Sequence, residues 1–169
     1  DTYLLYSFSE VINFDGASKE DRELLINKFN ELKKFNNNPY IISKLLEIAV
    51  ENGLSDEINK LKNRLLKLAT VEGNIVYWGE KDFYNRHFVN DPVEITSSAI
   101  RSLIISGEKS NLIENAIRWL VNQKRGNFWF STKQTASVIF SLSEYIKSSD
   151  ELKADFNVRI LVNGKEIKS

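Results

Sequence analysis

The sequence predicts an all-α fold of stacked antiparallel helical hairpins that ends in a short β-hairpin or strand. Each of the only two prolines follows a residue type that favours helix N-caps, in the pairs Asn38-Pro39 and Asp91-Pro92. Apolar residues recur at helical spacing along most of the chain. Near the C-terminus they alternate instead, before an Asn163-Gly164 pair that is typical of a two-residue hairpin turn.

Capping residues and glycines define the expected helices. Helices are expected over residues 2–12, 18–35, 39–52, 55–69, 92–106, 110–123 and 131–146. Ser18 and Ser55 are expected to act as further N-caps. Gly53 and Gly107 occupy the position where a helix commonly ends with a positive φ. Similar helix lengths and similar distances between successive starts indicate a repeat of helical hairpins.

Three of the expected helices carry a clear apolar face. Its members, at helical spacing, are Ile58, Leu61, Leu65 and Leu68; Ile113, Ala116, Ile117 and Leu120; and Val138, Ile139, Leu142 and Ile146. Two helix starts have the spacing of a capping box, Asp91 with Glu94 and Ser131 with Gln134. We expect Glu94 to return a hydrogen bond to its cap, so this carboxylate pair is interpreted as structural rather than as an acid and base.

Two segments lie outside the helical pattern. Residues 71–91 are expected to form a loop that packs over a helix end, because this segment holds more aromatic residues, including Tyr77 and Trp78, than a solvated connection needs. From Phe156 onward we expect a β-unit. Because a single hairpin is unstable alone, this unit either belongs to a following β-domain or packs on the helices.

The composition excludes several functional classes. Lys plus Arg and Asp plus Glu are 23 each and no basic cluster occurs, so no nucleic-acid partner is expected. The absence of Cys excludes disulfides and thiolate metal sites. No apolar run is long enough to span a membrane, and no membrane contact is expected. Because the chain lacks Met and begins inside an apolar pattern, we expect it to be a piece of a longer polypeptide.

One run of residues resembles a known family. Residues 117–136 read Ile-Arg-Trp-Leu-Val-Asn-Gln-Lys-Arg-Gly-Asn-Phe-Trp-Phe-Ser-Thr-Lys-Gln-Thr-Ala. They resemble a hallmark of the alpha-2-macroglobulin and complement family, in which Arg-Trp-Leu-x-x-Gln-Arg, a glycine-rich aromatic turn and Ser-Thr-Gln-Asp-Thr follow one another. Here Lys133-Gln134 stand in place of Gln-Asp, and Gly126 is the one glycine left in the turn.

The likeness extends along most of the chain. Residues 93–99 are similar to the family's Val-Glu-x-Thr helix start, residues 38–40 to the preceding inner helix, and residues 156–164 to the strand that leaves the domain. The positions matched to the family motifs are Glu94, Thr96, Trp119, Gln123, Gly126, Trp129, Ser131, Thr132, Gln134 and Thr135.

The resemblance implies a fold and a function. Residues 1–150 would be part of a thioester-containing domain, an α/α toroid of inner and outer helices, and residues 151–169 a strand exit into a following β-domain. In the family a Cys-Gly-Glu-Gln motif forms the thioester, which this cysteine-free chain cannot form. We therefore expect an extracytoplasmic, periplasmic or cell-surface module of a protease-trapping inhibitor, with no enzymatic activity and no cofactor. Its expected partners are target proteases, through the full-length parent, and the parent's neighbouring β-domains.

Two other functions stay open. One is a helical-repeat scaffold without a reactive group. The other is a terpenoid cyclase or prenyltransferase fragment, because those enzymes share the α/α toroid, although the sequence lacks their clustered aspartates and zinc ligands. The lone His87 is interpreted as a surface or turn residue rather than a base or metal ligand.

Exposed apolar surface is also expected. Trp119, Phe128, Trp129 and Phe130 are interpreted as packing adjacent hairpins together rather than as a platform for carbohydrate or lipid. A stack that lacks its first hairpins would expose an apolar side, so we expect the isolated chain to self-associate.

Overall fold

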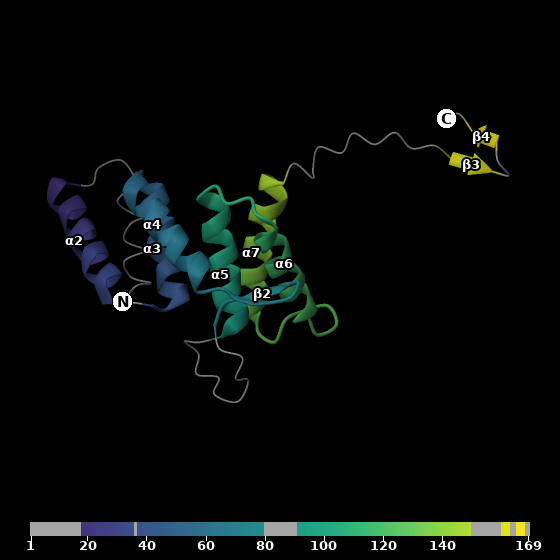
Figure 1. The fold of residues 1–169 in the computed structure, drawn as a ribbon, viewed down its shortest axis with the longest axis horizontal. Helices are drawn as coiled ribbons and strands as arrows, with labels where there is room; N and C mark the ends of the chain where they lie inside the picture. The colour runs from purple at the N-terminus through teal and green to yellow at the C-terminus, as the bar shows by residue number, and fades with distance from the viewer. Residues whose placement is uncertain (1–17, 36, 80–90, 150–159, 163–164, 168–169) are drawn as a thin grey trace.

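The computed structural model describes residues 18–35, 37–79, 91–149, 160–162 and 165–167. The helices are α2 (Lys19–Phe35), α3 (Pro39–Glu51), α4 (Ser55–Lys67), α5 (Pro92–Ile105), α6 (Asn111–Asn122) and α7 (Thr132–Ser148) (Figure 1). The strands are β1 (Thr70–Glu72), β2 (Ile75–Tyr77), β3 (Ile160–Val162) and β4 (Lys165–Ile167). Six of the seven expected helices are confirmed to within two residues at each end. The expected helix over 2–12 lies outside the described residues.

Helices α3, α5 and α7 form a row in which α5 lies between the other two. Helix α4 packs against α3, and α6 packs against α5, so each pair forms a helical hairpin. Helix α2 contacts α3, and Figure 1 shows α2 at the opposite end of the row from α7. Ten of the 14 residues of α5 are buried, which makes α5 the central helix of the stack.

The first residues of α3 and α5 follow the same local rule. The Asn38 side chain accepts a hydrogen bond from the backbone N of Tyr40 at 2.9 Å, and Asp91 accepts one from the backbone N of Val93 at 2.9 Å. In both helices proline is the first helical residue, where no N–H donor is needed. Both predicted N-caps are confirmed.

The ends of α3 and α5 are also alike. Gly53 has a φ of 65° and Gly107 a φ of 83°, and this left-handed conformation favours glycine. The backbone N of Leu54 donates back to the carbonyl of Ala49 at 2.9 Å, and the equivalent bond after Gly107 is 3.0 Å. These bonds close Schellman motifs at the predicted glycines.

Of the two further predicted caps, one is confirmed and one is wrong. Ser18 Oγ accepts a hydrogen bond from the backbone N of Asp21 at 3.1 Å and caps α2. Ser55 is instead the first residue of α4, and the N-cap position is held by Leu54, which makes no side-chain capping bond. The reason is that the Schellman turn of α3 ends at Leu54, so α4 begins with no intervening residue.

The segment after α4 is only partly as expected. Strands β1 and β2 pair with Glu72 opposite Ile75, around a two-residue turn in which Gly73 has a φ of 61°. The expectation of a loop is wrong here, because strands of three residues are too short to show alternation in the sequence. The expected packing is confirmed for Tyr77, which is 3% exposed, and for Trp78, which is fully buried. Residues 80–90 of this segment lie outside the described residues.

The C-terminal strands and α7 test two further predictions. Strands β3 and β4 pair with Val162 opposite Lys165, which confirms the hairpin around Asn163-Gly164.

In α7 the predicted apolar face is wrong for half of its members. Val138 is fully buried, whereas Ile139 is 53% and Ile146 is 39% exposed. Helix α7 has apolar residues on two sides, and only one side meets α5.

Candidate functional site

The family-like residues meet where α5 and α7 begin, around a turn that joins α6 to α7 (residues 123–131). Gln123 is the C-cap of α6, and Gly126 has a φ of 64°. Backbone hydrogen bonds between Arg125 and Phe128, of 2.8 and 3.4 Å, close the turn. These contacts fix the direction in which the chain approaches α7.

Trp129 attaches this turn to the preceding helix. Its indole N–H donates to the carbonyl of Leu120, near the end of α6, at 2.8 Å, and the residue is 7% exposed. Its backbone N donates to Thr135 Oγ1 at 3.4 Å, and that hydroxyl donates to the carbonyl of Ser131 at 3.0 Å. One tryptophan therefore connects the end of α6 to the start of α7.

The start of α7 is capped by two side chains. Ser131 Oγ accepts from the backbone N of Gln134 at 3.1 Å, as the capping-box spacing predicts. Gln134 Oε1 accepts from the backbone N of Phe130 at 3.0 Å, one residue before the cap, and its amide N donates to Asp91 at the start of α5. Thr132 is the first residue of α7. The caps of α5 and α7 are thus joined through Gln134.

A second tryptophan occupies the equivalent place before α5. The indole N–H of Trp78 donates to the carbonyl of Leu65, near the end of α4, at 2.8 Å. Its backbone N donates to Thr96 Oγ1 at 2.9 Å, and this hydroxyl also lies 3.2 Å from the backbone carbonyl of Trp78. The two tryptophans show an internal repeat that the sequence analysis did not find, because Trp78 lacks the flanking motif of Trp129.

Trp119 connects helix α6 to strand β2. Its ring stacks on that of Tyr77, with centroids 5.2 Å apart and planes at 16°. Phe128 and Phe130, by contrast, are 62% and 58% exposed. The interpretation of the aromatic residues as packing groups holds for the two tryptophans and is wrong for the two phenylalanines. The two phenylalanines flank the buried Trp129 in the sequence. Because alternate residues in an extended segment point to opposite sides, both phenylalanine side chains point outward.

Glu94 does not return a hydrogen bond to Asp91. Its carboxylate instead forms an ion pair with Lys133 of α7. Burial raises the pKa of Glu94, although the hydrogen bond from Lys133 acts in the opposite direction. The same hydrogen bond raises the pKa of Lys133. The two directions differ because the side chain of Lys133 is 62% exposed whereas that of Glu94 is 11% exposed. The surroundings of the pair therefore stabilise the charged form of Lys133 but the protonated form of Glu94.

A buried ion cluster joins α3 to α5. Lys44 Nζ lies 3.2 and 3.1 Å from the two carboxylate oxygens of Glu47, and Arg101 Nη1 lies 3.0 Å from Glu47 Oε2. The side chain of Glu47 is fully buried. Sequence reasoning missed this cluster because Lys44 and Glu47 are spaced like an ordinary surface pair. Because Lys44 and Glu47 lie on α3 and Arg101 lies on α5, the contact between Arg101 and Glu47 links the two helices.

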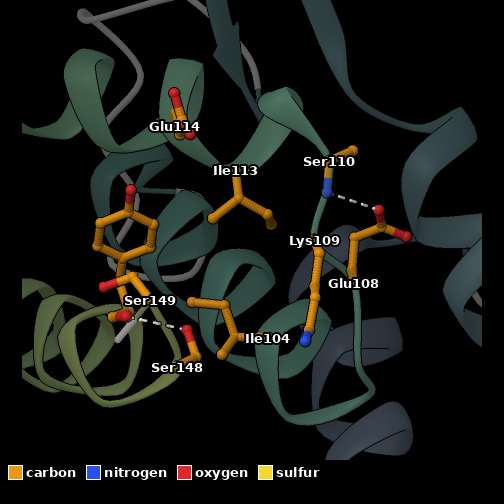
Figure 2. Close-up of a pocket in the computed structure, with 9 residues that line it drawn as sticks. Ile104, Glu108, Lys109, Ser110, Ile113, Glu114, Ser148 and Ser149 are labelled. Atoms are coloured by element: carbon orange, nitrogen blue, oxygen red, sulfur yellow. Dashed lines mark hydrogen bonds between the residues drawn. The ribbon is translucent and has the colours of Figure 1, made fainter. Parts of the chain in front are cut away.

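A cavity of about 390 Å³ lies where α5 and α7 end and α6 begins, at the opposite end of α5 and α7 from the family-like residues (Figure 2). Glu108 accepts a hydrogen bond from the backbone N of Ser110 at 3.1 Å. Ser148 and Ser149 donate to backbone carbonyls of their own helix. Glu108, Ser148 and Ser149 thus bond to nearby backbone, and Lys109, Glu114 and Tyr145 also line the cavity.

Within the described ranges, no group of three or more His, Cys, Asp or Glu side chains is placed to hold a metal ion. No helix in this part of the chain is both long and apolar enough to cross a membrane. His87 lies outside the described residues.

Sequence comparison adds no relative. The chain matches no protein-family model and no curated protein sequence.

Proposed function

We propose that this chain is the helical module of a macroglobulin-like protease trap, acting outside the cytoplasm and carrying no thioester of its own. One observation carries the proposal. The residues that resemble the family motif, from Trp119 to Thr135, join the end of α6 to the starts of both α5 and α7. A motif whose side chains position helices, rather than carry out chemistry, is what a structural module needs.

The arrangement of helices also supports the proposal. The row of α3, α5 and α7, with α4 and α6 packed outside it, has the order of inner and outer helices that an arc of an α/α toroid would have. The chain contains no Cys, so its part in trapping would be to hold its neighbouring β-domains in place. Target proteases would be met by the whole assembly.

The test uses the longer polypeptide that this proposal requires. After incubation with an endopeptidase, we expect cleavage of a large protein substrate to fall while cleavage of a small peptide substrate continues. Trp129→Ala should weaken trapping because it removes the anchor of the α6–α7 turn, whereas the exposed neighbour variant Phe128→Ser should retain it. A protease that keeps full activity on large substrates would overturn the proposal.

A second candidate is a helical-repeat scaffold without a reactive group. It is favoured by the polar side chains of Thr96, Ser131 and Gln134, all of which bond within the molecule. A scaffold would bind a partner without changing protease activity on substrates of any size. The same assay therefore distinguishes the two functions.

A further inference from the structure

Helix α7 carries a second apolar side, which we name the α7 outer face. It consists of Phe130, Thr132, Ala136, Ile139, Phe140, Ser143 and Ile146. The four large members, Phe130, Ile139, Phe140 and Ile146, are 58%, 53%, 66% and 39% exposed. The opposite side of the helix, with Val138 and Ser141, is buried against α5. A helix that is apolar on two sides is typical of one that packs against two neighbours.

The spacing of this face fits another helix. Thr132, Ala136, Ile139, Ser143 and Ile146 follow one another in alternating steps of four and three residues. This is the spacing of a coiled-coil seam, in which each side chain enters a hole on the facing helix. The small side chains of Ala136 and Ser143 on either side of Ile139 would let a second helix approach closely.

The charged residues at the two ends of the α7 outer face are complementary when a second copy of the face runs antiparallel to the first. Residues 134–143 contain no charged side chain. At the start of α7, Lys133 pairs with Glu94, and near its end Lys147 Nζ lies 3.0 Å from Glu144. A second α7 running antiparallel would place the exposed Lys133 ammonium group of one copy near the Glu144 carboxylate of the other, and the same contact would occur twice. An interface that matches itself in this way suits a two-fold dimer.

The exposed area of this face would supply most of the apolar part of a dimer interface. The four large side chains expose about 400 Å² together, taking roughly 200 Å² for a full side chain of this size. A standard interface buries about 800 Å² on each partner, of which roughly two-thirds is apolar in homodimers. The four large side chains thus account for about half of that area, and the smaller side chains of Thr132, Ala136 and Ser143 add to it.

We propose that two copies of this chain form a two-fold dimer through antiparallel packing of their α7 outer faces, with Ile139 and Phe140 at the centre. The inference does not depend on the proposed function. It also differs from the expectation drawn from the sequence, which placed the exposed apolar side where the first hairpins would be missing.

Sedimentation of the full 169-residue chain tests the dimer. The mean mass should rise from one chain to two with concentration, and Ile139→Glu should abolish the rise while circular dichroism stays helical. Leu24→Glu is the matched control, because Leu24 also lies on a helix and is 52% exposed. A chain that remains monomeric, or equal effects of the two variants, would overturn the proposal.

A disulfide test fixes the geometry. The chain has no cysteine, so Ile139→Cys introduces a single thiol per copy. Under mild oxidation we expect Ile139→Cys to form a covalent dimer faster than Leu24→Cys does. Equal rates would show random collision, and that result would contradict a contact centred on α7 even if the mass measurement showed dimers.

Discussion

Trp78, before α5, and Trp129, before α7, make the same hydrogen bond in different surroundings. Each donates its indole N–H, at 2.8 Å, to a carbonyl in the last turn of the preceding helix. Trp78 is fully buried, and Thr96 contacts both its N–H and its carbonyl. Trp129 lies between two exposed phenylalanines, and its bond to Thr135 is longer, at 3.4 Å. The bond is repeated, but burial depends on whether the turn adjoins the centre or the end of the stack.

Removing each indole gives the largest expected difference. Trp78→Ala should lower the free energy of unfolding by about 5 kcal/mol, and Trp129→Ala by about 3 kcal/mol, since the site of Trp129 lies between two exposed side chains and can collapse or hydrate. Urea unfolding followed by circular dichroism measures both. Equal losses of unfolding free energy would show that Trp78 and Trp129 are equally buried in solution, which would contradict the comparison.

The two threonines test the backbone contacts. Thr96→Val keeps the shape but leaves buried donor and acceptor groups of Trp78 unpaired, so we expect a loss of about 2–3 kcal/mol. Thr135→Val removes the long bond from Trp129 and the hydroxyl's bond to the carbonyl of Ser131, at a half-buried site where water can replace both, and should cost about 0.5–1 kcal/mol. The same unfolding experiment compares them, and a larger loss for Thr135→Val contradicts the interpretation.

The glycines of the two turns differ in the space around them. Gly79 has a φ of 101°, and a Cβ there would lie 3.2 Å from Ile95 Cδ1 and 3.3 Å from Pro92 Cα. Gly126 has a φ of 64° with nothing within 4 Å. Gly79→Ala should cost about 2 kcal/mol, and Gly126→Ala about 1 kcal/mol from backbone strain alone. Thermal unfolding of both variants should rank them in this order.

The smallest expected effect concerns the ion pair that joins the starts of α5 and α7. Because burial raises the pKa of Glu94, the stability linked to its proton is present below its ordinary pKa and is lost as pH rises through the raised value. The ionised carboxylate therefore opposes folding at neutral pH. We expect Glu94→Gln to leave the free energy of unfolding at neutral pH unchanged or slightly higher.

Glu57 on α4 provides the opposite case. Its hydrogen bond with Lys33 of α2 holds its pKa below the ordinary value. Its stabilising contribution is therefore present above that ordinary pKa and is lost as pH falls through the lowered one. Glu57→Gln should destabilise the chain at neutral pH, and the difference from the wild type should vanish in acid. Urea unfolding across this range checks both signs, and two variants with the same pH dependence would contradict the distinction.

Local signals predicted the helix ends well. An N-cap with a following proline acts on the next few backbone N–H groups, and Asn38 and Asp91 do this as expected. Gly53 and Gly107 end helices because their φ is a property of one residue and its neighbours. Ser55 failed because the preceding turn, rather than its own preference, decided where α4 begins.

The candidate site was predicted as a set of positions but not as a set of contacts. The capping bond from Gln134 to Ser131 spans three residues and was foreseen, whereas the bond from Gln134 to Asp91 spans 43 residues and was not. The partner of Glu94 was wrong for the same reason. A carboxylate near an N-cap can bond to the backbone of its own cap or to a side chain of another helix. Lys133 comes within reach of Glu94 only because α5 packs on α7.

The sequence by itself determined where the helices start and stop, the C-terminal hairpin and the position of the α6–α7 turn, because these depend on residues a few positions apart. The tertiary structure decided which side of α7 is buried, which of the aromatic residues are exposed and which charges pair. Those outcomes depend on surfaces that come together only when separate hairpins pack, and the spacing within one helix cannot specify them.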